Sequence, residues 1–248
     1  MTSAETKQRY IYCLEGNWNK HPHSNQSIRP ILELLFTFSK TKYIYRKCPT
    51  KEDFINGLHT FTQKRYSNYT VLYIAYHGRK NRIYFGNEYI TLKEIADVLE
   101  GKLHGKIIHF GSCSTLNTTE RNITDFIKRT GCSFVSGYKK DVPYIESSAF
   151  ELLYFNVLDT YRTYTTIKKN IISKYPTLVD ILNSNYYTYY LFLYIGAWKI
   201  YVPGYILEMT VSNLDFSSVS NPPFGSEDIL FSNSFVLRLS LRYSVSPK

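Results

Sequence analysis

The sequence predicts an α/β fold with a mainly parallel central sheet, helices on both faces in a three-layer sandwich, and a β-rich C-terminal extension. Strand-like and helix-like segments alternate along the first 150 residues. Two segments, TVLYIAY (70–76) and KIIHF (106–110), are short apolar runs. Such runs are typical of strands that are buried on both faces, and these strands occur in parallel sheets.

Strands are predicted from short segments rich in β-branched and aromatic residues. In chain order they cover 9–14, 41–47, 70–76, 106–110 and 132–138. A hairpin is predicted over 82–90, because Gly86-Asn87 at its centre suits a tight turn. The carboxyl ends of parallel strands meet at one edge of a sheet, so the loops that follow them are expected there.

Helices are predicted from apolar residues at helical spacing and from residues that cap helix ends. In chain order they cover 27–39, 49–65, 91–99, 118–131 and 146–161. Ser27, Thr50 and Thr91 are the candidate N-caps, with acidic residues three positions after the last two. Pro30 can shift the start of the first helix, and Gly131 is expected to end the fourth.

The character of the sequence changes after about residue 185, where helical periodicity fades. We therefore divide the chain into a main domain, 1–185, and an extension, 186–248, packed on the same domain. Residues 234–243 alternate like an amphipathic strand. Residues 186–202 are rich in tyrosine and contain Lys199. A membrane-spanning helix needs about 20 predominantly apolar residues, so this segment is predicted as one or two buried strands.

Composition limits the possible functions. The 248 residues are 44% hydrophobic, which is enough for a large core and excludes a fully disordered chain. The formal net charge is +10, but the basic residues do not cluster in a long run, so a nucleic acid partner is not predicted. The N-terminus has charges and no apolar stretch, which indicates a cytoplasmic protein whose four cysteines are free thiols.

Two chemically capable residues follow the predicted central strands. His77 follows 70–76 directly, and Cys113 follows 106–110 in the sequence GSCS. If the two strands are neighbours, the imidazole can activate the thiol or protonate a leaving amine. The backbone N–H groups of Gly78 and Cys113 are then candidate oxyanion donors. A helix beginning after Cys113 is expected to lower the pKa of its thiol.

The segments VLYIAYHG and KIIHFGSC resemble the caspase-like fold of cysteine peptidases, and most closely its bacterial CHAT-type branch, which is related to caspases and separase. In that group one hydrophobic strand ends in His-Gly and the next ends in the nucleophilic cysteine. The segments CSFVSGY and ESSAFELL are also similar to that branch, so the resemblance covers roughly residues 8–160. The chain lacks the QAC-R/Q/G-G run of animal caspases, so a preference for acidic P1 residues is not carried over.

The resemblance implies a regulated cysteine endopeptidase that acts on a protein substrate, in bacterial defence or cell death, under the control of a regulatory protein or ligand. It implies His77 and Cys113 as the catalytic pair and no cofactor. Two alternatives stay open. One is a non-catalytic caspase-like module that binds a protein, and the other is a basic nucleic-acid-binding protein, which would need clustered basic and aromatic residues.

Glu15 and Asp141 are candidate substrate-binding residues, because each follows a predicted strand at the same sheet edge. A carboxylate in a P1 pocket would select arginine or lysine. The competing interpretation is that both are solvated loop acids. His21 and His23 lack a nearby third ligand, so no metal is predicted. The remaining cysteines are weaker nucleophile candidates or core residues: Cys13, Cys48 and Cys132.

Overall fold

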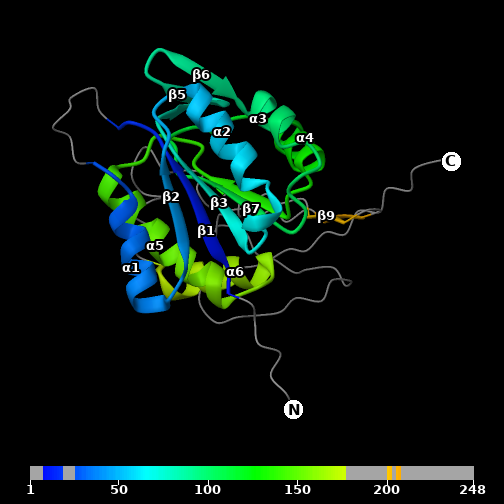
Figure 1. The fold of residues 1–248 in the computed structure, drawn as a ribbon. Helices are drawn as coiled ribbons and strands as arrows, with labels where there is room; N and C mark the ends of the chain where they lie inside the picture. The colour runs from blue at the N-terminus through cyan, green and yellow to red at the C-terminus, as the bar shows by residue number, and fades with distance from the viewer. Residues whose placement is uncertain (1–7, 19–25, 177–199, 203–204, 208–248) are drawn as a thin grey trace, which may run out of the picture. The chain divides into compact units, whose positions relative to one another are not determined.

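The computed structural model describes residues 8–18, 26–176, 200–202 and 205–207 of the chain. Its central sheet has five strands in the order β2-β1-β3-β7-β8, and every neighbouring pair is parallel (Figure 1). The strands are β1 (Tyr10–Glu15), β2 (Tyr43–Lys47), β3 (Tyr69–Ala75), β7 (Ile107–Phe110) and β8 (Phe134–Gly137). The predicted parallel sheet is confirmed, and so is the pairing of its two central strands, β3 and β7.

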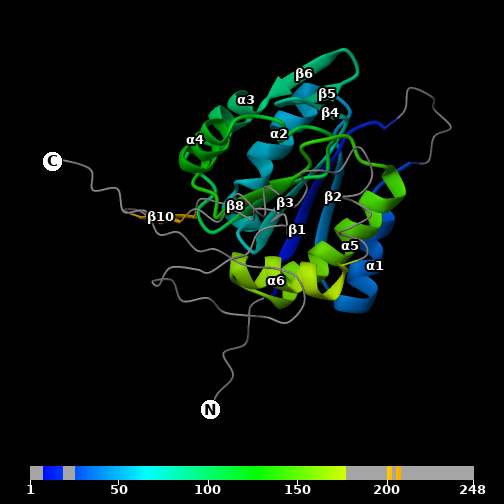
Figure 2. The ribbon, with the colours of Figure 1, turned by 180° about the vertical axis from the view of Figure 1, so that it is seen from behind.

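Helices cover both faces of this sheet, which gives three layers (Figures 1 and 2). One face carries α1 (Arg29–Ser39), α5 (Tyr144–Thr160) and α6 (Tyr164–Lys174). The other carries α2 (Lys51–Phe61), α3 (Leu92–Val98) and α4 (Glu120–Thr130), with a short 3-10 turn, η1 (Lys64–Tyr66), after α2. Because side chains alternate along a strand, neighbouring residues of β1 and β3 pack against opposite helix layers.

Aromatic residues fill both interfaces between the sheet and the helices. On the α2 side, the rings of Tyr12 and Phe61 lie 5.2 Å apart, and both residues are buried. On the α5 side, the rings of Tyr73 and Phe155 lie 4.9 Å apart. Each such buried ring contributes about 1.5–3 kcal/mol through removal of apolar surface from water, so the sheet is anchored on both faces.

A second, antiparallel sheet follows β3 directly. It consists of β4 (Gly78–Arg79), β5 (Arg82–Phe85) and β6 (Glu88–Thr91), in that order. The hairpin predicted around Gly86-Asn87 is β5–β6. The two-residue strand β4 was not predicted, because it is too short to show a pattern. This strand begins directly after His77.

The predicted caps agree with the structure except at the first helix. Thr50 and Thr91 each form a complete capping box, and Gly131 ends α4 with a φ of 73°. The predicted N-cap at Ser27 is wrong, since the N-cap of α1 is Ile28; the hydroxyl of Ser27 donates to the carboxylate of Glu15 and accepts from the N–H of Arg29 at 3.1 Å. The helix α6 was missed in the sequence.

Two compact units are present, Met1–Leu191 and Phe192–Lys248, whereas the predicted boundary was residue 185. The described part of the second unit is an antiparallel pair, β9 (Ile200–Val202) and β10 (Tyr205–Leu207). The predicted strand at 234–243 lies outside the described residues. None of the described helices combines the length and the apolar character that crossing a membrane requires.

Candidate active site

The loop that carries His77 and the turn that carries Cys113 are in contact at the carboxyl edge of the sheet. A Cβ atom built on Gly78 would collide with the side-chain oxygen of Thr115 and the carbonyl oxygen of Cys113, and would lie 2.9 Å from Cβ of Ser112. Only glycine allows this approach, because any larger residue would push the two backbones apart. The structure therefore brings together the two segments that the sequence singled out.

Hydrogen bonds hold the cysteine turn against the small sheet. The backbone N–H of Asn81 donates to the carbonyl of Thr115 at 3.1 Å. The hydroxyl of Thr115 donates to the carbonyl of Arg82 at 3.2 Å, and its side chain is fully buried. These bonds tie residues 112–116 to the β4–β5 turn. Together with the Gly78 contact, they fix the position of Cys113 relative to β4.

The loop after β1 orients the His77 ring. The ring is exposed, and its Nε2 lies at the carbonyl oxygen of Trp18. A carbonyl can only accept, so Nε2 carries the hydrogen and Nδ1 of the neutral ring keeps its lone pair. The indole of Trp18 also packs edge-on against the imidazole, with ring centroids 5.4 Å apart. The ring is thus held with Nδ1 as its basic atom.

The carboxylate of Glu15 is fully buried behind this loop and is occupied by donors from the protein. It accepts from the indole N–H of Trp18 at 2.5 Å and from the backbone N–H of Ile28 at 2.8 Å. Further donors are the hydroxyl of Ser27 at 2.7 Å and the hydroxyl of Tyr45 at 2.5 Å, and the ammonium of Lys47 forms an ion pair at 3.9 Å. Glu15 therefore anchors the residue whose carbonyl orients His77.

The Cys113 thiol is half-buried and is not activated by its surroundings. Burial raises the pKa of the thiol; the contact with Val142, whose carbonyl lies 3.9 Å from the sulfur, lowers it in part, and the carboxylate of Asp141 raises it further. The expected helix effect is wrong, because α4 begins only at Glu120 and a turn separates it from Cys113. A thiol with a raised pKa is protonated at neutral pH, so reaction requires a base.

Asp141 lies beside the cysteine turn and is exposed. Its Oδ1 accepts from the hydroxyl of Ser114 at 2.7 Å. Its Oδ2 has no hydrogen-bond partner among the described residues. Ser114 itself has a φ of 53°, an uncommon conformation for a residue with a side chain. The loop after β8 is therefore fastened to the turn directly after Cys113, and one carboxylate oxygen of Asp141 makes no hydrogen bond with the described residues.

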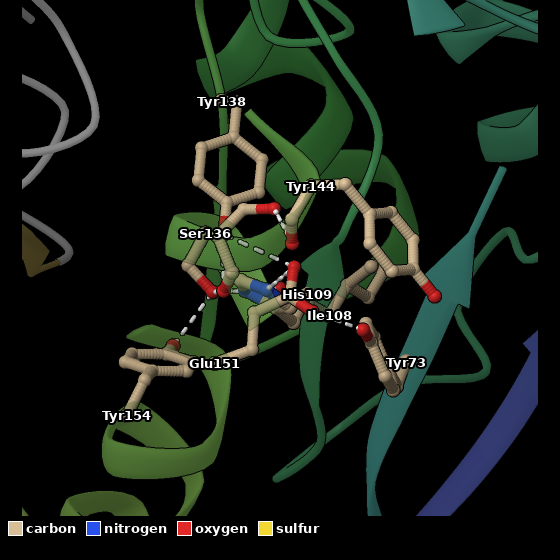
Figure 3. A network of polar contacts seen from close by, with 9 residues as sticks. Tyr73, Ile108, His109, Ser136, Tyr138, Tyr144, Glu151 and Tyr154 are labelled. Atoms are coloured by element: carbon tan, nitrogen blue, oxygen red, sulfur yellow. Dashed lines mark hydrogen bonds and ion pairs between the residues drawn. The ribbon is translucent and has the colours of Figure 1, made fainter. Parts of the chain in front are cut away.

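A buried polar network joins the central sheet to α5 (Figure 3). His109 bonds through Nδ1 to the hydroxyl of Ser136 at 2.9 Å and through Nε2 to Glu151 at 3.4 Å. The Tyr154 hydroxyl lies 2.6 Å from that of Ser136. Ser136, His109 and Glu151 are thus bonded in the same order as the nucleophile, base and acid of a catalytic triad. All three residues are buried, so a substrate cannot reach them and the network is structural.

Glu151 of the same network lies close to Gly111, at the start of the cysteine turn. The hydroxyls of Tyr73 and Tyr138 both donate to Glu151, the second at 3.1 Å. Burial raises the pKa of both tyrosines well above the ordinary value. A Cβ at Gly111 would lie 2.8 Å from Oε1 of Glu151. The sequence places His109 inside a strand, but gives no signal for Glu151, which lies 42 residues further along.

A cleft of about 740 Å³ opens beside His77. Its walls include Trp18 from the loop after β1 and Tyr84 and Phe85 from β5. His77 and Arg79 also line it, whereas Cys113 does not. The imidazole and the glycine that packs on the cysteine turn, Gly78, thus border the cleft, whereas the thiol does not line it.

Among the described residues, the remaining candidates do not form a site. Cys13, Cys48 and Cys132 are buried, as expected of core residues. In the part of the chain that the structure describes, no group of three metal-ligating side chains exists. His21 and His23 lie outside the described residues.

The comparisons with known proteins concern the whole α/β unit. Nothing among the curated proteins matches the chain. Residues 8–190, which include every strand and helix that builds the site, match a family described as "Family of unknown function (DUF6642)". The match covers well over half of the 248 residues. The chain thus belongs to the DUF6642 family, whose function is unknown.

Proposed function

We propose that this chain is a cysteine endopeptidase of the caspase-like kind, in which Cys113 attacks a peptide carbonyl and His77 transfers protons. One observation carries the proposal: Gly78, next to His77, is packed against the backbone of Cys113 at the carboxyl edge of two adjacent parallel strands. The strand endings that resemble caspase-like peptidases thus lie side by side.

The chemistry follows from the orientation of the imidazole. Nδ1 of His77 takes the thiol proton as the sulfur of Cys113 bonds to the carbonyl carbon. The negative oxygen is stabilised by the N–H groups of Gly78 and Cys113. The C–N bond then breaks, and the leaving amine receives the proton from Nδ1. Water attacks the thioester with His77 as base, which releases the acid and restores the thiol.

The raised pKa of Cys113 fits an enzyme that is inactive at rest. Binding of substrate or of a regulatory protein or ligand would bring Nδ1 to the thiol and supply the base that the resting site lacks. For P1 selection we favour Asp141, because its Oδ2 has no partner among the described residues while Glu15 is surrounded by donors. A basic P1 side chain would form an ion pair with this carboxylate.

The test is digestion of a synthetic peptide library and a denatured protein, followed by sequencing of the products. We expect cleavage by the wild type and by the control variants Cys132→Ala and His59→Ala, which alter a buried cysteine and an exposed histidine elsewhere. Cys113→Ala and His77→Ala should be inactive while retaining the wild-type circular dichroism spectrum. Equal cleavage by Cys113→Ala would overturn the proposal. Binding of a protein without cleavage by any variant would favour the non-catalytic module.

A further inference from the structure

The position of the cleft relative to the catalytic pair defines which part of a substrate it receives. In acyl transfer the thiol retains the half of the substrate that ends in the carbonyl, and the general acid protonates the half that leaves as an amine. The cleft is lined by His77 and not by Cys113. When the scissile carbonyl lies at the sulfur and the amine nitrogen lies at the imidazole, the residues after the cut are on the His77 side, where the cleft opens.

The cleft walls favour apolar and aromatic side chains. Trp18 is part of the lining; its indole N–H is already used by Glu15 and its ring is held against His77. Tyr84 and Phe85 contribute further lining from β5, and Phe85 is itself fixed by the rings of Phe54 and Tyr76. These walls are preformed, so binding of an apolar residue costs little ordering of the protein.

Arg79 gives the described lining of the cleft a positive charge. Arg79 is exposed, lines the cleft and forms no ion pair with the described residues. The arginine three residues further along is engaged, since Arg82 lies over the ring of Tyr89 at 4.5 Å. None of the described residues lining the cleft is acidic. A guanidinium in this setting suits a carboxylate, which it binds through two parallel hydrogen bonds.

We infer that the cleft between Trp18 and β5 is the subsite for residues that follow the scissile bond, and that it selects an acidic side chain next to an aromatic or large aliphatic one. This inference rests on the proposed peptidase function, because only that reaction defines a leaving half. It adds a second determinant, on the opposite side of the cut from the basic P1 preference proposed for Asp141.

The experiment sequences both halves of each product from a synthetic library in which all positions are randomised. The wild type should show Asp or Glu enriched among the first three residues after the cut. Arg79→Gln should lower kcat/KM for these peptides about tenfold, the order expected for loss of a charged hydrogen-bonded pair, and leave neutral peptides unchanged. Arg79→Glu should shift the preference to Lys and Arg. Arg121→Gln, on an exposed arginine of α4 outside the cleft, is the matched control and should behave as wild type.

A binding measurement separates failure of the subsite from failure of the function. Fluorescence anisotropy of a labelled acidic-aromatic peptide is measured with Cys113→Ala alone and combined with Arg79→Gln or Arg121→Gln. Cleavage that depends on Cys113 but shows no acidic preference after the cut, or an acidic preference before it, would overturn the subsite and leave the peptidase standing. No cleavage, with peptide binding that depends on Arg79, would overturn the peptidase and with it the leaving-half assignment. No cleavage and no binding that depends on Arg79 would overturn both.

Discussion

The carbonyl oxygen of Trp18 accepts a hydrogen bond from Nε2 of His77, and the indole N–H of the same tryptophan donates to a buried carboxylate. Trp18 is thus fixed at both its backbone and its side chain. The hydrogen bond between His77 and Trp18 links the loops that follow β3 and β1, which are neighbouring strands of the sheet. A carboxylate that does not touch the proposed reacting atoms therefore controls the direction of the imidazole.

Substitution of that carboxylate should impair both stability and turnover. Glu15→Gln keeps the size of the side chain but replaces an oxygen that accepts hydrogen bonds by an amide that donates. We expect a loss of about 2–4 kcal/mol in the free energy of unfolding, as for other buried charged networks that lose one member. Because the Trp18 carbonyl would no longer be held, kcat should fall more than KM rises. Urea denaturation and steady-state kinetics measure these two effects.

The control for this variant is Glu33→Gln, which removes an exposed partner of Arg29 on α1. An exposed pair of this kind contributes at most about 0.5 kcal/mol. If Glu15→Gln were as stable and as active as Glu33→Gln, the role assigned to Glu15 would be wrong.

The contact between Gly78 and the cysteine turn should not tolerate a methyl group. In Gly78→Ala the new carbon would meet backbone and side-chain atoms of residues 112–115, and backbone cannot move cheaply. We expect a loss of about 1–3 kcal/mol in stability and of nearly all cleavage activity. Gly101→Ala is the comparison, since no atom lies within 4 Å of a Cβ there and the residue does not line the cleft, although its φ of 66° adds some strain. An activity loss in Gly101→Ala as large as that in Gly78→Ala would argue against a specific role for the loop contact.

The Cys113 thiol should react slowly at neutral pH. Its pKa is raised by burial and by Asp141, so the thiolate fraction, and with it alkylation by iodoacetamide, should increase only as the pH exceeds the ordinary range for a thiol. In Asp141→Asn the negative charge is gone, the pKa falls, and labelling at pH 7 should be faster. Cys113 should still be labelled first, since the other three cysteines are buried. Mass spectrometry of tryptic peptides gives the rate at each site, and slower labelling in Asp141→Asn would contradict this account.

Local sequence signals predicted much of the fold. The capping boxes at Thr50 and Thr91 depend on residues only three positions apart, so they are visible in the sequence. The buried strands β3 and β7 are visible for the same reason, because burial on both faces leaves a continuous apolar run. Their endings were sufficient to indicate His77 and Cys113.

The parts of the site that were missed depend on contacts between distant residues. Ser27 has the side chain of an N-cap, but a buried carboxylate 12 residues earlier accepts from its hydroxyl and holds it outside the helix, which begins after Ile28. The role of Glu15 depends on donors up to 32 residues away, and Glu151 meets His109 only because α5 packs on the sheet. The sequence alone does not distinguish an acidic residue that follows a strand and faces solvent from one that is buried among hydrogen-bond donors. Tertiary packing decides which of these occurs.

Two buried serines near the site give opposite predictions for the same substitution. The hydroxyl of Ser112, next to Cys113, is buried and has no hydrogen-bond partner among the described residues. The hydroxyl of Ser136 bonds to both His109 and Tyr154. A buried hydroxyl without a partner costs free energy, whereas removal of one that has partners leaves those partners unsatisfied.

We therefore expect Ser112→Ala to leave the protein as stable as wild type or to stabilise it by about 1 kcal/mol, and Ser136→Ala to destabilise it by about 1–3 kcal/mol. If the buried network supports the cysteine turn through Gly111, Ser136→Ala should also lower kcat, although Ser136 is too deeply buried to touch a substrate. Thermal and urea unfolding of the two variants, with cleavage rates measured alongside, test both statements. A strong loss of activity in Ser112→Ala without loss of stability would instead show that this hydroxyl takes part in the reaction, which its position against Gly78 would then explain.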